Sequence, residues 1–424
     1  MEENAAVLKP EPSAMFRWGV LIFISFAMFG NYYIYDSVSP LADLLAKQLK
    51  FSDSDIGLLN AIYSFPNIIM VLIGGIIIDK LGTRISTIIF AAVCLIGAAT
   101  TAATSSFSIM AAGRLIFGLG AESLIVAVTT VIGRWFKGKE LSFAFGINLT
   151  IARLGSFAAL NSPTWGSGFY NDWQYPLLVS VAAGVISVAA AIIYFGMDVF
   201  AAKNFSLREV PKQDKIIWSQ VFRFSSSFWY ITLLCVTFYS AMFPFQTFAV
   251  KFFMETHGVS REYGGFLSSM LTLSAMVLTP LFGLLSDYIG RRSLLMMFGS
   301  LLIIPVYLLM VYTNINLIIP MSIMGIAFSL VPAVMWPSVA LIVDEAKLGT
   351  AYGLMTMIQN IGLFLFNLII GYANDMTGGY TAGMWIFSSL GFFGLFFAYF
   401  LRRSSSVSGG FNLEKGMMHH KKTE

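Results

Sequence analysis

The sequence predicts an all-α membrane protein with twelve transmembrane helices in two pseudo-symmetric bundles of six. Of its 424 residues, 57% are hydrophobic and 11% are charged, and the mean hydropathy is +0.77. A water-soluble domain could not hide so much apolar surface. Each helix needs about 20 residues to cross about 30 Å of hydrocarbon, so the chain has room for roughly twelve spans. One loop sequence also recurs at matching positions in the two halves.

Apolar runs between charged or Gly/Pro-rich breaks predict the positions of the spans. The first six are expected near residues 18–38, 56–78, 86–104, 114–133, 143–163 and 175–198. The last six are expected near 228–250, 264–285, 293–312, 317–341, 349–373 and 381–401. The resulting domains are an N-terminal segment (1–17), an N-terminal bundle (18–200), a linker (201–227), a C-terminal bundle (228–403) and a disordered tail (404–424).

The distribution of basic residues predicts that both termini, the linker and the tail are cytoplasmic. Most of the 26 Lys and Arg residues then lie on the cytoplasmic side. The exceptions are an intramembrane Arg153 and five residues at the outer side: Lys47, Lys50, Arg114, Lys251 and Arg261. Residues 1–16 lack the apolar core of a signal peptide, so the first apolar run should be a retained span.

The repeated loop reads Gly-x-x-x-Asp-x-x-Gly-x-Arg at 75–84, after the second span, and at 283–292, after the eighth. It resembles the signature of the major facilitator superfamily. In that family the aspartate lies against the N-terminus of a helix from the other half, where the helix dipole favours a negative charge. Asp79 would then face residues 348–350, and Asp287 would face residues 141–142.

Such contacts can form in only one of two rocking arrangements, so the resemblance implies a latch for alternating access. An ordinary loop-stabilising role is the alternative. The expected gating residues are Asp79, Arg84, Asp287, Arg291, Arg292 and Arg114. Arg114 opens a Gly-rich stretch that resembles the superfamily's fourth-helix signature, although it could instead snorkel to the outer interface.

Two opposite charges are expected at one depth in the membrane. Glu122 lies about 12 Å below the outer surface on the fourth span, and Arg153 lies about 15 Å below it on the fifth. A charge at mid-membrane costs at least about 3 kcal/mol, so each needs a partner or water. The simplest arrangement is a Glu122–Arg153 pair, either as a structural ion pair or as a site that a zwitterionic substrate separates.

Other polar or aromatic residues at mid-span are candidates for the same site, although packing is the alternative for each of them. They are Tyr32, Tyr35, Phe243, Gln246, Trp336, Gln359 and Asn360. Two of these neighbour a proline, and proline-interrupted spans are common binding or gating positions in transporters. Asp36, at the end of the first span, is expected to be solvated.

Longer stretches at 113–124, 135–141, 152–156, 335–337, 348–353 and 358–360 resemble the lysosomal dipeptide uniporters of the superfamily. That resemblance implies movement of dipeptides, with Glu122 and Arg153 engaging the two charged ends. The chain has no clear dileucine sorting signal, and no glycosylation acceptor is expected on the lumenal side. We therefore expect a bacterial inner (plasma) membrane, with the lysosomal membrane as the alternative. We expect a monomer and do not assume the accessory glycoprotein of the lysosomal relatives.

The first functional hypothesis is a dipeptide uniporter, without ATP because no Walker loop is present. The alternative is a proton-coupled carrier of organic anions, with Glu122 titrating and Arg153 or Arg114 holding the anion. A non-transporting membrane sensor or scaffold is the third hypothesis. Three histidines with no cysteine or acidic cluster at ligand spacing predict no metal site, and we expect no cofactor, no enzymatic activity and no nucleic-acid partner.

Overall fold

The computed structural model describes residues 10–136, 140–206, 224–344, 347–407 and 413, so most of the expected tail and much of the linker lie outside the described residues. The first half contains α1 (Ala14–Asp36), η1 (Ser39–Leu41), α2 (Ala42–Leu49), α3 (Asp53–Ala61), α4 (Ser64–Ala102), α5 (Phe107–Phe136), α6 (Leu141–Leu160), α7 (Ser162–Trp165), η2 (Ser167–Asn171) and α8 (Gln174–Asn204). The second contains α9 (Ser226–His257), α10 (Arg261–Ile289), α11 (Arg292–Tyr312), α12 (Ile318–Ile342), α13 (Leu348–Thr377) and α14 (Thr381–Val407).

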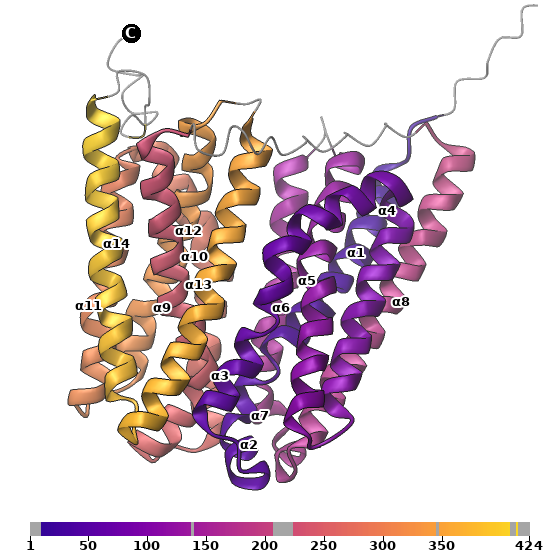
Figure 1. Cartoon of the computed structure of the whole chain (residues 1–424). Coiled ribbons are helices and arrows are strands. Elements are labelled where there is room, and N and C mark those ends of the chain that lie inside the picture. The colour runs from indigo at the N-terminus through magenta and orange to yellow at the C-terminus, as the bar shows by residue number, and fades with distance from the viewer. Residues whose placement is uncertain (1–9, 137–139, 207–223, 345–346, 408–412, 414–424) are drawn as a thin grey trace, which may run out of the picture.

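The two halves stand side by side as helical bundles (Figure 1). Eleven described segments are long and apolar enough to cross a membrane. The second predicted span is not one straight helix, because α3 ends at Ala61 and α4 begins at Ser64. Residues 53–81 supply the twelfth crossing, and α4 then bends at Gly82 and returns as the third span. The prediction of a twelve-span, two-bundle fold is confirmed in this form.

Local sequence signals explain where several helices begin and turn. Serine hydroxyls accept hydrogen bonds from the first turns of α1, α9 and α10, at Ser13, Ser225 and Ser260. In the repeated loops the second glycine has a positive φ, 76° at Gly82 and 69° at Gly290. Side chains with a Cβ rarely adopt this conformation, so both copies of the loop need glycine there.

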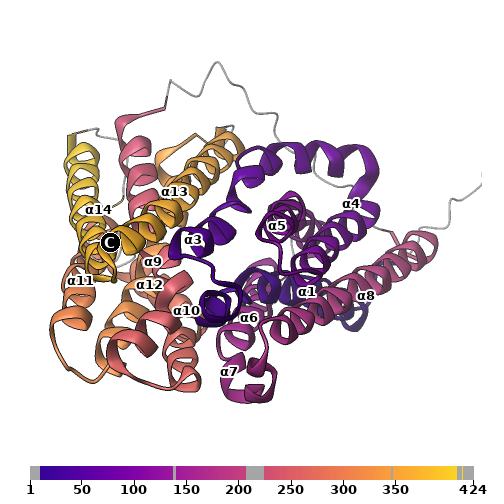
Figure 2. The ribbon, with the colours of Figure 1, turned by 60° about the horizontal axis from the view of Figure 1, so that its bottom comes forward.

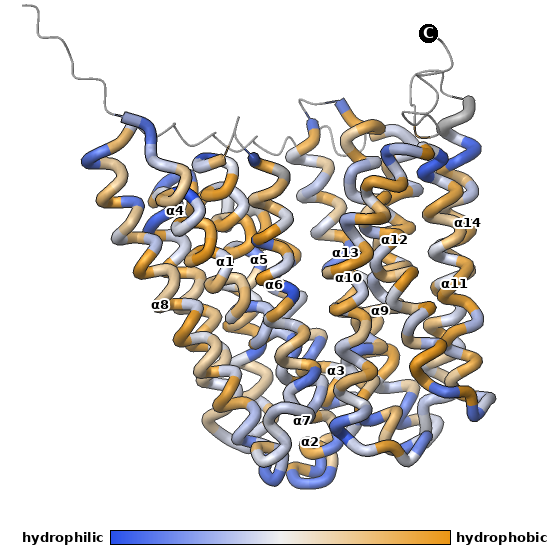
Figure 3. Tube along the Cα trace, turned by 180° about the vertical axis from the view of Figure 1, so that it is seen from behind, coloured by the Kyte–Doolittle hydropathy of each residue, from blue (hydrophilic) through white to orange (hydrophobic). Residues whose placement is uncertain are grey.

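Apolar side chains cover the outside of the bundle. Hydrophobic residues run along most of each helix, and polar residues gather toward the two ends (Figure 3). Large side chains such as Leu284, Val277 and Ile192 are more than half exposed. Contiguous exposed apolar surface on this scale requires lipid around it. The chain is a multi-pass membrane protein, and Cys94 and Cys235 are buried free thiols inside it.

The halves meet at the end of the bundle opposite the start of α1 and the end of α14 (Figures 1 and 2). We name this end the distal end and the opposite one the terminal end. At the distal end α3 packs against α13, and α6 and α7 pack against α10. Gly371 of α13 makes this closeness possible, because a Cβ at this position would lie 2.4 Å from the backbone oxygen of Asp53. At the terminal end the ribbons of the halves lie apart in Figure 1. The structure is therefore closed at the distal end.

Charged contacts between the halves reinforce this closure. Lys251 of α9 forms an ion pair with Asp53 of α3, and both side chains are about nine-tenths buried. The Asp375 carboxylate of α13 accepts hydrogen bonds from the backbone N–H groups of Asp53 (2.9 Å) and Ser54 (2.8 Å). An anion at a helix N-terminus is stabilised by the free N–H groups and the helix dipole.

A second ionic contact lies nearby. Arg261 of α10 donates to both carboxylate oxygens of Asp43 in α2, at 3.2 and 2.5 Å, and to the backbone oxygen of Tyr170 at 3.3 Å. We name the residues of these contacts between the halves the distal seal: Asp43, Asp53, Lys251, Arg261 and Asp375.

Arg114 does not snorkel to the interface, so that alternative is wrong. Its side chain is 2% exposed and donates to the backbone oxygens of Leu59, Ile34 and Tyr35 at 3.1 to 3.2 Å. These carbonyls belong to the last turns of α3 and α1, whose oxygens have no partner inside the helix. Arg114 therefore ties together two helix ends near the distal seal.

The predicted latch residues are not engaged across the halves. Asp79 is exposed and makes no hydrogen bond or ion pair with any residue that the structure describes. Asp287 pairs with Arg292 of its own loop at 2.6 Å, and Arg291 adopts a left-handed backbone conformation. Arg84 pairs with the buried Asp198 of its own half. The latch stays a prediction for the conformation closed at the terminal end.

We expect Lys251→Met to shift the protein toward a distal-open conformation, because the variant leaves the Asp53 carboxylate buried without a cation. Breaking one partner of a buried ion pair costs about 3 to 5 kcal/mol. The measurement is the spin-label distance between Ser105→Cys and Asn314→Cys, two exposed positions in the distal loops of the two halves.

The matched control is Lys47→Met, since Lys47 pairs with Asp43 inside one half and is 62% exposed. An exposed pair contributes about 0 to 1 kcal/mol. If Lys251→Met leaves the distance distribution as the control does, the ion pair does not hold the distal end closed.

Candidate functional site

Two charged side chains of the N-terminal half lie near Tyr32. Tyr32 of α1 lies within electrostatic range of Glu122 on α5 and Arg153 on α6. The Arg153 guanidinium carbon is 5.6 Å from the centre of the Tyr32 ring, a cation–π distance. Both charges are therefore near the same residue of α1.

Close packing of α6 on α1 positions Arg153. A Cβ at Gly155 would lie 2.2 Å from the backbone oxygen of Phe29, so only glycine allows the two backbones to approach this closely. Arg153, two residues earlier on α6, is thereby brought to the Tyr32 ring, less than one helical turn along α1 from Phe29.

The expected direct pair between Glu122 and Arg153 does not form in this structure, which has no ion pair between them within 4.0 Å. The Arg153 guanidinium instead lies 5.6 Å from the ring centre of Phe328, on α12 of the other half. The guanidinium thus lies near the rings of both Tyr32 and Phe328. Glu122 forms no ion pair with any described residue.

Aromatic side chains of the C-terminal half continue from Phe328. Tyr239 and Phe243 stack with ring centres 5.6 Å apart, and Phe243 meets Phe328 edge-on at 5.9 Å. The Trp336 indole N–H donates to the Tyr239 hydroxyl at 2.9 Å, and the Tyr352 hydroxyl donates to the Trp336 backbone oxygen at 3.0 Å. We name these five residues the aromatic wall. The site thus has a charged side from one half and an aromatic side from the other.

Two of the predicted site residues make hydrogen bonds within the C-terminal half, as side chains with a packing role do. Asn360 is 2% exposed and donates to the Thr356 backbone oxygen of its own helix at 3.0 Å. Gln359 accepts a weak hydrogen bond from the buried Cys235 thiol at 3.5 Å. Both contacts lie inside the C-terminal half, so the structure does not bring these two amides to Arg153.

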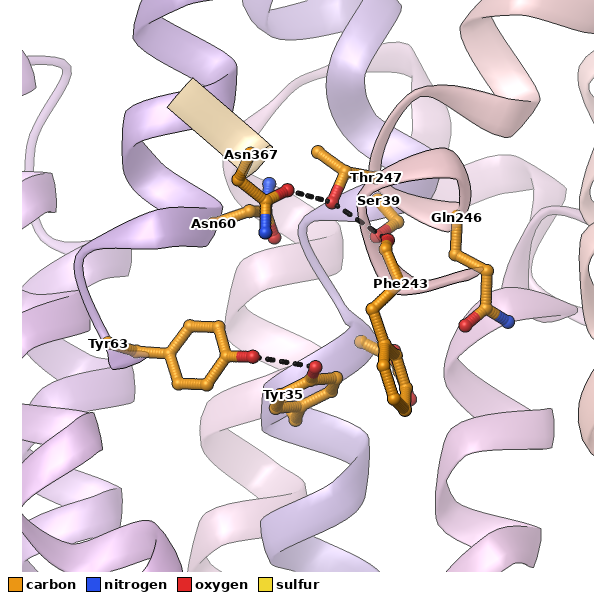
Figure 4. A pocket seen from close by; sticks show the side chains of 9 residues that line it. Tyr35, Ser39, Asn60, Tyr63, Phe243, Gln246, Thr247 and Asn367 are labelled. Atoms are coloured by element: carbon orange, nitrogen blue, oxygen red, sulfur yellow. Dashed lines mark hydrogen bonds between the residues drawn. The ribbon is translucent and has the colours of Figure 1, made fainter. Parts of the chain in front are cut away.

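The other predicted residues lie beside the site, toward the distal end. Tyr35 meets Phe243 of the opposite half with ring centres 6.1 Å apart. The Tyr63 hydroxyl donates to the Tyr35 hydroxyl at 2.6 Å (Figure 4). Together with Gln246 these residues line a small cavity between the halves.

Asp36 is also part of this cavity, which contradicts its expected solvation. The residue is only 6% exposed. Asp36 lies at the end of α1. The expectation that it is solvated assumes that the chain leaves the bundle at this point. Instead η1 and α2 continue along α9 and cover that end of the helix.

Sequence reasoning missed Phe328 and the distal seal. Phe328 lies within a continuous apolar span, so no pattern distinguishes it from lipid-facing neighbours. Asp53, Lys251 and Asp375 stand in three different segments, and only the docking of the halves brings them together. The sequence feature that could have identified these three residues is a charged side chain at the distal end of a span. Among the described residues, no group of three or more His, Cys, Asp or Glu is placed to hold a metal ion.

Comparison with known proteins agrees with this architecture. The sequence profile of the Major Facilitator Superfamily matches residues 21–264 and 245–417. The lysosomal dipeptide transporter MFSD1 of Danio rerio is 33% identical over 372 residues, which cover 85% of this chain and 81% of the relative. The hexuronate transporter of Escherichia coli (strain K12) is 22% identical over 85% of this chain and 88% of its own length.

A solved structure shows the same fold at low sequence identity. A mutant form of the nucleoside transporter NupG superposes with a TM-score of 0.74 and 15% identity, covering 91% of this chain and 99% of the other. The matched profile extends over both bundles and includes both copies of the Gly-x-x-x-Asp loop. The chain therefore belongs to the Major Facilitator Superfamily.

Proposed function

We propose that this protein moves dipeptides across a membrane by alternating access, as a uniporter. The observation that carries the proposal is the arrangement of Glu122 and Arg153, two opposite charges near Tyr32 that do not pair with each other. A dipeptide carries an ammonium group and a carboxylate separated by about 7 Å of extended chain. It can engage both side chains at once, whereas a direct ion pair would leave no place for it.

Each side of the site has a distinct task in this proposal. Glu122 accepts hydrogen bonds from the substrate ammonium, and the planar Arg153 guanidinium binds the substrate carboxylate with two parallel bonds. The aromatic wall offers apolar ring faces to the substrate side chains. The relationship to MFSD1 of Danio rerio, named as a lysosomal dipeptide transporter, supports this substrate class.

The distal seal supports a transport cycle. The halves are joined at the distal end and lie apart at the terminal end, so Arg153 and Phe328 meet between halves that can rock. The distribution of basic residues favours placing the termini in the cytoplasm. In this orientation the structure corresponds to an inward-facing state of a carrier that we place in a bacterial plasma membrane, acting as a monomer.

A proton-coupled carrier of organic anions is the second candidate, favoured by the relationship to the hexuronate transporter. Arg153 would then be the anion anchor. Arg114 would not serve, because its guanidinium is buried and bound to three backbone oxygens. Glu122 would bind a proton on each cycle instead of the substrate ammonium.

We expect Glu122→Gln and Arg153→Ala each to reduce dipeptide uptake into proteoliposomes by about 10- to 100-fold. A hydrogen bond to a charged group contributes about 1.5 to 3 kcal/mol, and each variant removes one such interaction. Asp172→Asn, a change in a distal loop that keeps a capping side chain, is the control. Full uptake by either site variant would remove the physical basis of the substrate assignment.

Uniport predicts that an imposed pH gradient changes the final level of accumulated dipeptide little. A uniporter equilibrates its substrate, because no second gradient does work on it. The measurement is the internal to external ratio of labelled dipeptide at long times, with and without the gradient. Accumulation well above the external concentration supports the proton-coupled alternative and contradicts uniport.

We expect Phe328→Leu to raise the KM for dipeptide about 2- to 30-fold with a smaller effect on kcat. The substitution removes a cation–π contact of about 0.5 to 2 kcal/mol that holds the Arg153 guanidinium in place. Phe328→Tyr keeps an aromatic face and should restore the KM. If the leucine and tyrosine variants behave alike, Phe328 does not position Arg153.

A further inference from the structure

The cavity between Tyr35 and Thr247 is a small chamber built by both halves (Figure 4). Its volume is about 10 Å³, close to the space that one water molecule needs. Nine residues line it: Tyr35, Asp36, Ser39, Asn60 and Tyr63 from the N-terminal half, and Phe243, Gln246, Thr247 and Asn367 from the C-terminal half. All but one of these side chains carry an oxygen atom. The cavity is too small for a dipeptide, so it is not the substrate site.

Asp36 is the charged residue of this lining, and its carboxylate has no cationic partner. No described lysine, arginine or histidine nitrogen lies within 4.0 Å of it, although the residue is 94% buried. The Ser156 hydroxyl of α6 lies beside it. A buried carboxylate without a compensating charge is strongly unfavourable unless it is neutralised.

The charged and titratable groups around Asp36 do not supply that compensation directly. Arg114 of α5 acts on it only from a distance, because its guanidinium is bound to three backbone oxygens. Arg153 of α6 is likewise within electrostatic range but is held between two aromatic rings.

The remaining neighbours that can titrate are tyrosines. The Tyr35 and Tyr63 hydroxyls bond to each other, and Tyr32 lies one turn away on α1. The residues that α9 and α13 contribute to the cavity are uncharged. Of these, the Thr247 hydroxyl is already bonded to the Asn367 amide oxygen at 2.9 Å (Figure 4).

We propose that this cavity binds one small monovalent cation on Asp36, a proton or a sodium ion. A carboxylate in a cavity lined by hydroxyl- and amide-bearing side chains offers the kind of oxygen ligands that hard cations take. The size of the cavity limits the occupant to a proton or an ion of about the dimensions of water. Binding neutralises the only carboxylate that lines the cavity.

The position of the cavity determines when the cation can bind. Its walls come from both halves, so it is complete only while the distal end is closed. Opening the distal end separates the walls and exposes Asp36 to the distal solution, where a free carboxylate is hydrated. The cation therefore stabilises the distal-closed conformation and exchanges with the distal side. It shifts the closing equilibrium without driving accumulation, so the inference is compatible with uniport but does not depend on the substrate.

The test measures the closing equilibrium with no substrate present. The spin-label distance between Ser105→Cys and Asn314→Cys is recorded for the full-length protein in lipid nanodiscs, where Cys94 and Cys235 are buried away from the label. One series varies pH in sodium-free buffer, and a second varies sodium at fixed alkaline pH. The ratio of closed to open protein should rise with the cation, by up to about tenfold for each tenfold increase, the limit for a single site.

Asp36→Asn supplies the decisive comparison, because the neutral amide mimics the occupied carboxylate. This variant should stay distal-closed at every pH and sodium concentration. Asp172→Asn, the control acid in a distal loop, should respond as the unaltered protein does. A response to pH assigns the proton, and a response to sodium assigns the metal ion.

Two outcomes would overturn the proposal. One is a ratio of closed to open protein that changes with neither pH nor sodium, and the other is an Asp36→Asn variant that responds as the control does. Neither outcome depends on dipeptide transport. A failure here is therefore distinguishable from a failure of the proposed function, which the uptake experiments test separately.

Discussion

A charge inside the hydrocarbon layer must be paired, hydrogen-bonded or hydrated, and this constraint organises the whole molecule. Lys251 satisfies Asp53 at the distal end, Arg261 satisfies Asp43, and Arg114 is bound by backbone oxygens of two helix ends. Glu122, Arg153 and Asp36, by contrast, have no ion-pair partner among the described residues. These three unpaired charges belong to the proposed substrate site and the proposed cation site, where a bound ligand would supply the missing partner.

The same constraint gives a physical account of the two ends of the transport cycle. In this structure the Asp375 carboxylate, near the C-terminus of α13, caps the N-terminus of α3 at the distal end. The expected latch would place Asp79, at the other end of the same span, on the N-terminus of α13. The second and eleventh spans would thus exchange the same carboxylate–helix contact at opposite ends. In that proposal only one of the two would form at a time, so breaking one contact would be compensated by making the other.

Much of the fold was predictable because lipid imposes long apolar runs, and the repeated glycine loop marked the internal symmetry. The break at Ile62 and Tyr63 was not, since both residues are apolar and continue the run. The rise of 1.5 Å per residue predicted Glu122 and Arg153 at one level, and both are near Tyr32 in the structure. It could not reveal that Arg153 meets Phe328 rather than Glu122, because the choice depends on how the halves dock. The burial of Asp36 likewise follows from the path of η1 and α2, which the sequence does not disclose.

The central proposal is that Glu122 binds the ammonium group of a dipeptide and Arg153 binds its carboxylate. The most direct measurement is the thermal stabilisation of the purified protein by dialanine, N-acetyl-dialanine and dialanine amide, in the unaltered protein and in Glu122→Gln and Arg153→Ala. The account predicts that dialanine stabilises the unaltered protein most, that Glu122→Gln no longer discriminates against the acetylated peptide, and that Arg153→Ala no longer discriminates against the amide. Equal stabilisation of the unaltered protein by all three peptides would contradict it.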